Sequence, residues 1–269
     1  MTIDARAMVD PDARIGERVH IGPWSIVGPG VEIGDDCSID AHVVLRGPTR
    51  LGDRNRISPF ASIGADTPAL AYGGEPTTLV IGDDNRFREG VTIHRGTVQD
   101  RGETRLGSHN LLMPYVHVGH DAIVGDHCIF ANNASVSGHC RVGDHAGLGG
   151  YAGLPQYRSV GAHAFVGAMS LVTKDVPAYT SVAGHPARAL GLNAEGLRRR
   201  GFDDASLDLL RRALRIVYRS GLRLSEAIDR LGELDDPAGH LGLLIASLRE
   251  ARHGIVRPRG RDRIEDRES

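Results

Sequence analysis

The chain has 269 residues and a formal net charge of −2 at pH 7, and 41 % of its residues are hydrophobic but only 4 % aromatic. The near-neutral charge argues against a nucleic-acid-binding protein, which would normally be markedly basic. No apolar stretch is long enough to cross a membrane, and the N-terminus lacks the basic start and apolar block of a signal peptide. The core must therefore be built from Val, Ile, Leu and Ala, and the 35 glycines need a structural explanation.

Aliphatic residues recur every six positions through most of the chain. The six-residue repeat is interrupted over 65–80 and resumes at Ile81. It is interrupted again over 95–105 and then resumes one residue out of phase. From Leu106 it then continues without exception to Val172. Before the first break the repeating positions are Ile3, Val9, Ile15, Ile21, Val27, Ile33, Ile39, Leu45, Leu51, Ile57 and Ile63.

Each six-residue unit predicts one short strand and one corner. The position two before the key aliphatic is often small or branched, so two inward residues flank one outward residue, as in a strand. Gly often follows the key aliphatic, and we expect it to permit the tight corner. Three strands and three corners make one triangular coil, and stacked coils bury continuous aliphatic columns about 4.8 Å apart. The pattern predicts a parallel β-helix but does not give its hand.

The domain organisation follows from where the repeat begins and ends. We expect a β-helix over 1–190, with loops extruded at about 65–80 and 95–105. A helical domain is expected over 191–256, because Asn193 and Asp203 or Asp204 can cap helices that Gly201 and Gly221 end. The charged tail, 257–269, has almost no apolar residues and is predicted to be disordered.

The cysteines are predicted to be structural. An odd number of Cys without paired spacing fits a reducing cytoplasm better than a disulfide framework, so we expect a cytoplasmic protein. Cys37, Cys128 and Cys140 all occupy the small inward position of a hexad. Buried thiols are a commoner explanation of this placement than catalysis or metal binding.

The histidines divide by their place in the hexad. Six of the 13 fall three residues after a key aliphatic, where we expect solvated outward positions: His42, His109, His127, His139, His145 and His163. His117 and His120 instead flank the corner at Val118, and Asp121 adjoins His120. A His with a carboxylate neighbour and no nucleophile in a recognisable setting suits direct base catalysis on a substrate hydroxyl.

Three segments resemble the UDP-N-acetylglucosamine acyltransferase family of lipid A biosynthesis. They are GEPTTLVIGDDNRFREGVTIHRGTVQ (74–99), NLLMPYVHVGHDAIVGDHCIFANNASVSGH (110–139) and NAEGLRRRGF (193–202). The similarity spans roughly residues 3 to 220, both loops included. It implies a left-handed β-helix, a homotrimer and transfer of a 3-hydroxyacyl chain from acyl carrier protein to the 3-hydroxyl of UDP-N-acetylglucosamine. No cofactor or metal is implied.

The resemblance also assigns roles to individual residues. His120 would be the general base, Asp121 would support its imidazole, and the Gly138 N–H would stabilise the oxyanion. His117, His139, Gln156, Asn193, Glu195 and Arg199 would bind substrate, while Ala168 and Met169 would limit the acyl-chain length. The arginine-rich helices would favour docking of an acidic carrier protein; their arginines are Arg211, Arg212, Arg215, Arg219 and Arg223.

Several positions depart from the family and keep alternatives open. Ala69, Ala71 and Pro155 stand where the family usually has polar substrate contacts, so a different nucleotide sugar, such as an aminated one, is an alternative acceptor. A γ-type carbonic anhydrase would need three metal-binding His. His94, His117 and His120 are candidates, but that family's His-x4-His pair is missing. A third alternative is a scaffold or carrier-binding protein without catalysis, against which the presence of His120 and Asp121 argues.

Overall fold

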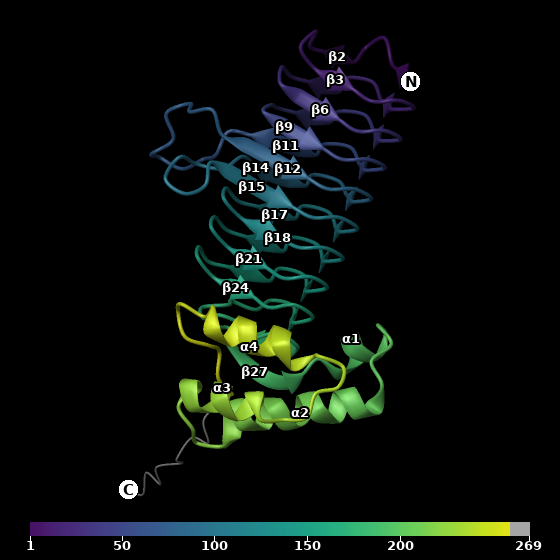
Figure 1. Ribbon diagram of the computed structural model, residues 1–269. Coiled ribbons are helices and arrows are strands. Elements are labelled where there is room, and N and C mark those ends of the chain that lie inside the picture. The colour runs from purple at the N-terminus through teal and green to yellow at the C-terminus, as the bar shows by residue number, and fades with distance from the viewer. Residues whose placement is uncertain (259–269) are drawn as a thin grey trace, which may run out of the picture.

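The structure is a computed structural model that describes residues 1–258. Short parallel strands wind into a three-sided prism, and helices lie at its C-terminal end (Figure 1). Successive strands belong in turn to sheets that we name A, B and C, so strands of one sheet recur every coil. The predicted tail, 257–269, falls almost entirely outside the described residues.

Sheet A consists of β1 (Thr2–Ile3), β4 (His20–Ile21), β7 (Ser38–Ile39), β10 (Arg56–Ile57), β13 (Arg86–Phe87), β16 (Leu111–Leu112), β19 (Ile129–Phe130), β22 (Gly147–Leu148), β25 (Phe165–Val166), β26 (Thr180–Gly184) and β27 (Ala187–Leu192). Sheet B consists of β2 (Met8–Val9), β5 (Ile26–Val27), β8 (Val44–Leu45), β11 (Ser62–Ala65), β14 (Thr92–His94), β17 (His117–Val118), β20 (Ser135–Val136) and β23 (Gly153–Leu154). Sheet C consists of β3 (Arg14–Ile15), β6 (Val31–Ile33), β9 (Thr49–Leu51), β12 (Thr78–Ile81), β15 (Glu103–Leu106), β18 (Ile123–Val124), β21 (Arg141–Val142) and β24 (Ser159–Val160).

The hexads build the core as predicted. Val118 pairs with Val136 in the next coil, and Val136 with Leu154 in the one after, so each inward side chain stacks on its equivalent. All three are at most 1 % exposed. Backbone hydrogen bonds such as His117 N–H to Ala134 O, 3.0 Å, tie successive coils together. The buried side chains thus form a continuous column along the prism axis.

The glycines serve a purpose other than the one predicted. The left-handed backbone at each corner lies three residues after the key aliphatic, and it is usually not Gly: φ is 58° at Asp121 and 62° at His139. The Gly next to the key aliphatic instead allows coils to approach. At Gly16, an added Cβ would lie 2.5 Å from Asp35 Oδ1 and 2.7 Å from the carbonyl carbon of Gly34. Close contact between coils, and not corner conformation, therefore selects most of these glycines, although Gly64 also has a left-handed φ of 80°.

The three cysteines are buried, as predicted. Each is at most 1 % exposed, and burial raises the pKa of the Cys37 and Cys140 thiols to about 11 and that of Cys128 to about 12. Their thiols donate to backbone carbonyls of the neighbouring coil, Cys140 Sγ to Pro155 O at 3.1 Å for example. Thiols this weakly acidic carry little thiolate at neutral pH and are poor nucleophiles.

Each of the three edges of the prism is named by the two sheets it joins. One edge, the C/A corner, carries a continuous ladder of polar side chains. Arg18 Nε lies 2.6 Å from Asp36 Oδ1, and Arg54 Nη2 lies 2.8 Å from Asp84 Oδ2. Four stacked imidazoles follow with ring centroids 4.7–4.8 Å apart, and the last of them packs against Tyr179: His109, His127, His145 and His163. The prediction that they lie on strand positions is wrong, because all four occupy left-handed corner residues. His109 and His127 are exposed as predicted, whereas His163 is only 9 % exposed.

The C-terminal segment closes the prism. Strands β26 and β27 form an antiparallel hairpin that extends sheet A. Four helices follow: α1 (Ala194–Arg198), α2 (Asp204–Arg219), α3 (Leu224–Gly232) and α4 (Leu241–Arg249). Asn193 and Asp203 cap α1 and α2 as predicted, each side chain accepting a backbone N–H. Among the described helices, none combines the length and apolar character that a bilayer crossing requires.

Both extruded loops leave the prism at the same edge. The first lies between β11 and β12 and the second between β14 and β15, so both emerge at the B/C corner, where they project together (Figure 1). Arg95, 6 % exposed, joins them: its guanidinium donates to Gly64 O, Asp66 and the Tyr72 hydroxyl. The two loops are therefore fixed to each other beside one corner of the stack.

The stacked imidazoles predict an acid-sensitive fold. Burial, and then the neighbouring His145, Arg200 and His240, lower the pKa of His163 to about 4. An unfolded His has a pKa of about 6.5. The unfolded state therefore takes up a proton first, and we expect the free energy of unfolding to fall by about 1–3 kcal/mol as the pH drops from 7 toward 4. Urea denaturation at several pH values measures this slope, which should flatten in His163→Gln; an equally steep slope in the variant would exclude His163 as its source.

Candidate functional site

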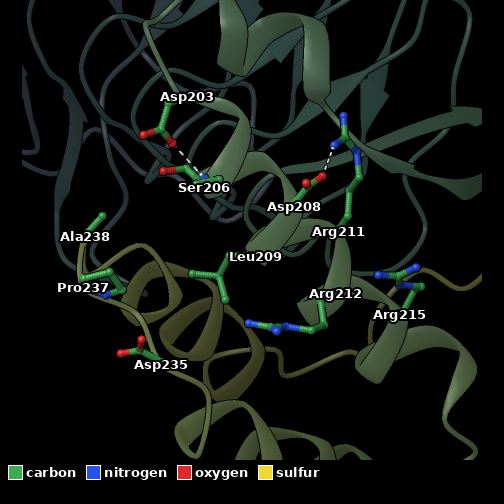
Figure 2. Close-up of a pocket in the computed structure, with 11 residues that line it drawn as sticks. Asp203, Ser206, Asp208, Leu209, Arg211, Arg212, Arg215, Asp235, Pro237 and Ala238 are labelled. Atoms are coloured by element: carbon green, nitrogen blue, oxygen red, sulfur yellow. Dashed lines mark hydrogen bonds and ion pairs between the residues drawn. The ribbon is translucent and has the colours of Figure 1, made fainter.

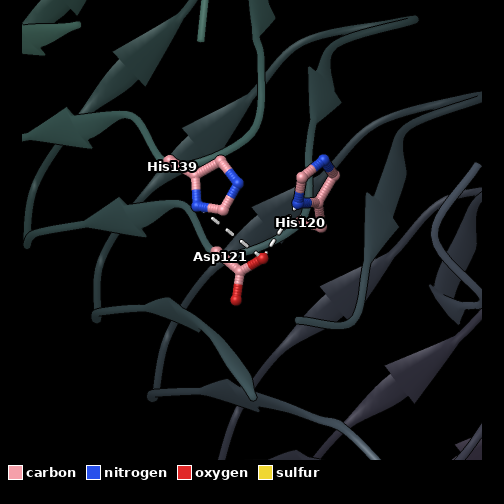
Figure 3. Close-up of side chains that lie close together, drawn as sticks. All are labelled: His120, Asp121 and His139. Carbon is pink, nitrogen blue, oxygen red and sulfur yellow. Dashed lines mark hydrogen bonds and ion pairs between the residues drawn. The ribbon is translucent and has the colours of Figure 1, made fainter. Parts of the chain in front are cut away.

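The B/C corner between β17 and β18 brings His120 and Asp121 into contact. The left-handed backbone at Asp121 turns the chain so that these two adjacent side chains meet, with His120 Nδ1 2.9 Å from Asp121 Oδ2 (Figure 3). Side chains at adjacent strand positions would point to opposite faces. The predicted dyad is thus a product of the corner geometry.

Asp121 is held by the second loop. It is 1 % exposed, and its carboxylate accepts the Thr97 hydroxyl at 2.7 Å and the Thr97 N–H at 3.0 and 3.1 Å. Its own N–H donates to Thr104 Oγ1 at 2.8 Å. The carboxylate accepts both donors of Thr97, and we infer that it also accepts the hydrogen bond from His120. The imidazole proton therefore lies on Nδ1, and Nε2 offers a lone pair.

The ring of His120 is largely covered but not sealed. Its side chain is 10 % exposed in the single chain. Within residues 1–258, Nε2 has no hydrogen-bond partner, and this atom keeps access to solvent. A general base must be able to reach a proton of the substrate. Nε2 meets this requirement, because Nδ1 is occupied by Asp121 and Nε2 is open to solvent.

Gly138 lies in the next coil, directly against this ring. A Cβ on Gly138 would lie 2.5 Å from His120 Cε1 and 2.6 Å from Nε2, so only glycine leaves room for the imidazole. In the described part of the chain the Gly138 N–H donates to no acceptor. A free backbone donor beside a base is the arrangement that an oxyanion requires.

His139 completes a compact cluster around Asp121 (Figure 3). Its ring meets that of His120 edge-on at 4.8 Å and stacks on Tyr157 at 4.4 Å. Its Nδ1 lies 2.9 Å from Asp100 Oδ2 and 3.9 Å from Asp121 Oδ2. A groove of about 740 Å³ opens here, bordered by Asp121, His139, Tyr157 and the second loop.

His117 and His94 lie on the adjoining face of sheet B. His117 Nδ1 is 2.9 Å from Thr92 Oγ1, and its ring meets that of His94 at 5.1 Å. Burial, with a contribution from His120, lowers the pKa of His117, and burial lowers the pKa of His94 to about 4. Both rings are therefore neutral at pH 7. The described residues close enough to share one ion are His120, Asp121 and His139, and not the trio of a carbonic anhydrase.

Of the other predicted substrate-binding residues, Gln156 shares the corner of His120, and the rest lie at another corner. Gln156 is exposed on the B/C corner, one coil beyond Gly138. Asn193 lies at the C/A corner, where its Nδ2 donates to His163 O at 2.9 Å. Glu195 on α1 and Arg199, which caps the C-terminus of this helix, form an exposed ion pair at 3.0 Å. Within one chain, sheet C separates these three residues from His120.

The residues predicted to limit acyl-chain length lie at the third corner. Ala168 and Met169 follow β25 at the A/B corner, and Met169 is 68 % exposed. Sheet B separates them from the dyad. The single chain therefore distributes the predicted base, nucleotide and acyl-chain residues over all three edges of the prism.

Known proteins resemble this chain over nearly its whole length. Residues 175–256 match the family described as UDP N-acetylglucosamine O-acyltransferase, domain 2, and residues 12–47, 30–65 and 103–138 match the bacterial transferase hexapeptide repeats. An acyl-(acyl-carrier-protein)–UDP-N-acetylglucosamine O-acyltransferase of Saccharophagus degradans is 56 % identical, covering 95 % of this chain and 99 % of the relative. One of Pseudomonas entomophila is 55 % identical with the same coverage.

The chain belongs to the UDP-N-acetylglucosamine O-acyltransferase family. It is therefore an acyltransferase, and this membership does not favour the carbonic anhydrase or scaffold alternatives. Solved structures agree: the enzyme of Acinetobacter baumannii, 45 % identical, superposes with a TM-score of 0.93 over 96 % of this chain and all of that one. That of Moraxella catarrhalis gives the same values. The predicted fold class, a left-handed parallel β-helix followed by C-terminal helices, is confirmed.

Sequence reasoning missed the groups that hold the dyad in this acyltransferase. Thr97, Asp100 and Thr104 contact Asp121 or His139, yet they lie 17 to 39 residues away in the sequence. The interruption over 95–105 indicated a functional loop, but not which of its side chains turn inward. Tyr157 was also missed; the 18-residue spacing from His139 could have placed it on the same corner.

The fit of His120 against Gly138 predicts a large effect of one methyl group. Gly138→Ala should push the imidazole away and misplace the backbone donor, so kcat should fall by about 100-fold or more. Gly150→Ala is the matched control, because a Cβ there would meet its nearest atom at 3.4 Å, an ordinary contact. Steady-state kinetics on both variants checks this; equal kcat values would show that the ring tolerates the methyl group.

Proposed function

We propose that this acyltransferase moves an (R)-3-hydroxyacyl chain from acyl carrier protein to the 3-hydroxyl of UDP-N-acetylglucosamine, the first step of lipid A biosynthesis. The observation that carries the proposal is the contact between His120 Nδ1 and Asp121 Oδ2 at 2.9 Å. It leaves Nε2 as an unprotonated base, next to Asp121, which borders the groove. The names of the relatives supply the two substrates.

The reaction that fits this geometry is direct transfer. His120 Nε2 takes the proton of the sugar 3-hydroxyl while its oxygen attacks the thioester carbonyl carbon. The Gly138 N–H donates to the carbonyl oxygen as negative charge develops on it; such a donor contributes about 3–4 kcal/mol in well-studied enzymes. The C–S bond then breaks, and the departing thiolate takes the proton from Nε2. Asp121 stabilises the imidazolium between these two transfers.

His139 and His117 are proposed to contact the substrates beside this base. Asp100 and Tyr157 fix the His139 ring, and Thr92 fixes His117. Gln156 is exposed on the B/C corner, one coil beyond Gly138, and is also proposed to contact the substrate. The reaction is proposed to take place in the cytoplasm, where reducing conditions suit the three free thiols.

The arginine-bearing face of α2 is the proposed docking surface for acyl carrier protein. A groove of about 640 Å³ runs along this helix, and Arg211, Arg212 and Arg215 line it (Figure 2). Arg211 is paired with Asp208 at 2.6 Å, whereas Arg212 and Arg215 are exposed. Arg219 lies one turn further along the helix, and exposed cations there would attract an acidic partner.

The distribution of the site over three corners supports a homotrimer. One chain has the base at the B/C corner, Asn193, Glu195 and Arg199 at the C/A corner, and Ala168 and Met169 at the A/B corner. Three copies related by a threefold axis parallel to the prism can bring different corners of neighbouring chains together. We propose that each active site combines His120 of one copy with the nucleotide-binding residues of the next.

The base assignment predicts a specific loss of turnover. With 3-hydroxyacyl carrier protein and UDP-N-acetylglucosamine as substrates, His120→Ala should lower kcat by about 100-fold or more, since general base catalysis contributes this much. His20→Ala, on an exposed strand position of sheet A, is the control and should keep full activity. Equal turnover by wild type and His120→Ala would remove the imidazole from the mechanism.

The shared site predicts complementation between two inactive variants. His120→Ala and Arg199→Ala subunits should each be impaired alone. Co-expressed in equal amounts, they should regain about a quarter of wild-type activity, because each mixed trimer then holds one intact site. Activity that stays at the level of the two separate variants would place the whole site within one chain.

A further inference from the structure

Thr97 contacts the dyad through the carboxylate of Asp121. It lies in the second loop, between β14 and β15, and is 2 % exposed. Its hydroxyl donates to Asp121 Oδ2 at 2.7 Å, and its backbone N–H is shared between Oδ1 and Oδ2 at 3.0 and 3.1 Å. The hydroxyl thus binds the same oxygen that faces His120 Nδ1.

Apart from His120 and the more distant His139 Nδ1, 3.9 Å from Oδ2, the remaining contacts of Asp121 are made by its backbone and not by its carboxylate. Thr104 Oγ1 accepts the Asp121 N–H at 2.8 Å, and Arg101 Nη2 donates to the Asp121 carbonyl at 2.7 Å. A carboxylate rotates easily about its last bond, since that torsion has only broad preferences. The Thr97 N–H contacts both oxygens, and it is unchanged when only the side chain is replaced. Among the described residues, the Thr97 hydroxyl is the side-chain donor, apart from His120, that engages Oδ2 within hydrogen-bonding distance.

Orientation of this carboxylate decides which nitrogen of His120 carries the proton. With Oδ2 aimed at Nδ1, the neutral ring keeps its proton there and Nε2 stays free. A rotated carboxylate would no longer favour that tautomer, and the fraction of rings able to accept a proton at Nε2 would fall. In other enzymes a wrong tautomer alone costs several orders of magnitude in kcat.

We propose that Thr97 is a positioning residue: its hydroxyl holds the Asp121 carboxylate so that His120 keeps the tautomer with a free Nε2. The second extruded loop thereby becomes part of the catalytic apparatus, although it touches no reacting atom. The inference rests on the proposed function for its effect on turnover. Its effect on the tautomer does not depend on that function.

The test compares isosteric and conservative variants. Thr97→Val removes the hydroxyl at nearly constant shape, Thr97→Ser retains it, and Thr97→Ala serves if the valine side chain prevents folding. Thr77→Val is the matched control, because Thr77 is also fully buried in the chain and its hydroxyl has no partner within residues 1–258. The readouts are kcat, KM for both substrates, and the His120 tautomer from ¹⁵N-histidine NMR, with the His120→Ala spectrum providing the assignment.

We expect wild type, Thr97→Ser and Thr77→Val to show a single His120 tautomer with Nδ1 protonated. Thr97→Val should show a mixture, with kcat reduced about tenfold and both KM values within about twofold of wild type. An unchanged tautomer in Thr97→Val would overturn the proposal, as would a changed tautomer with unchanged kcat in an enzyme that needs His120. If His120→Ala itself retained full turnover, the proposed function would fail, while the tautomer spectra would still decide whether Thr97 orients the dyad.

Discussion

Backbone hydrogen bonding between parallel coils governs this molecule, because it stacks each residue on its equivalent in the next coil. The pairing of Ile123 with Arg141, and of Arg141 with Ser159, shows the stride of 18 residues in coils without an inserted loop. Strand spacing is about 4.8 Å, so any side chain at a corner meets another at nearly ring-stacking distance. Side chains at one corner therefore contact those at the same corner of the neighbouring coils. They form ladders of ion pairs, of imidazoles, or of a base and the glycine that makes room for it.

The pairing of strands between coils also explains why the candidate site lies at a corner of the prism. An insertion within a strand would break pairing with both neighbouring coils, whereas an insertion at a corner leaves the strands in register. Both loops leave at the B/C corner, and there the second one reaches the dyad through Thr97 and His139 through Asp100. The rigid stack places His120 against Gly138, and the loop supplies contacts that the four-residue corner between β17 and β18 cannot provide.

The six-residue period predicted the prism, the buried cysteines and the position of both loops, because each depends on residues close in the sequence. It gave the wrong reason for the glycines. A Gly beside the key aliphatic suggested a corner conformation, but the contact that excludes a side chain at Gly16 comes from the next coil. The contact of Thr97 with Asp121 was likewise invisible, since it joins residues 24 apart across a loop whose path no local pattern specifies. Family resemblance supplied the role of Gly138, and the structure adds the steric reason for its identity.

The two ends of the rod are not equivalent. The C-terminal end is closed by the β26–β27 hairpin and four helices, whereas β1, β2 and β3 each pair on one side alone among the described strands. Ile3 and Met8 in that first coil are 37 % and 59 % exposed. The first coil thus presents strand edges and apolar side chains that the described residues leave uncovered. Whole turns could be added or deleted there without disturbing any corner below, which makes the length of the rod a modular property, separable in evolution and in protein engineering from the chemistry carried further down.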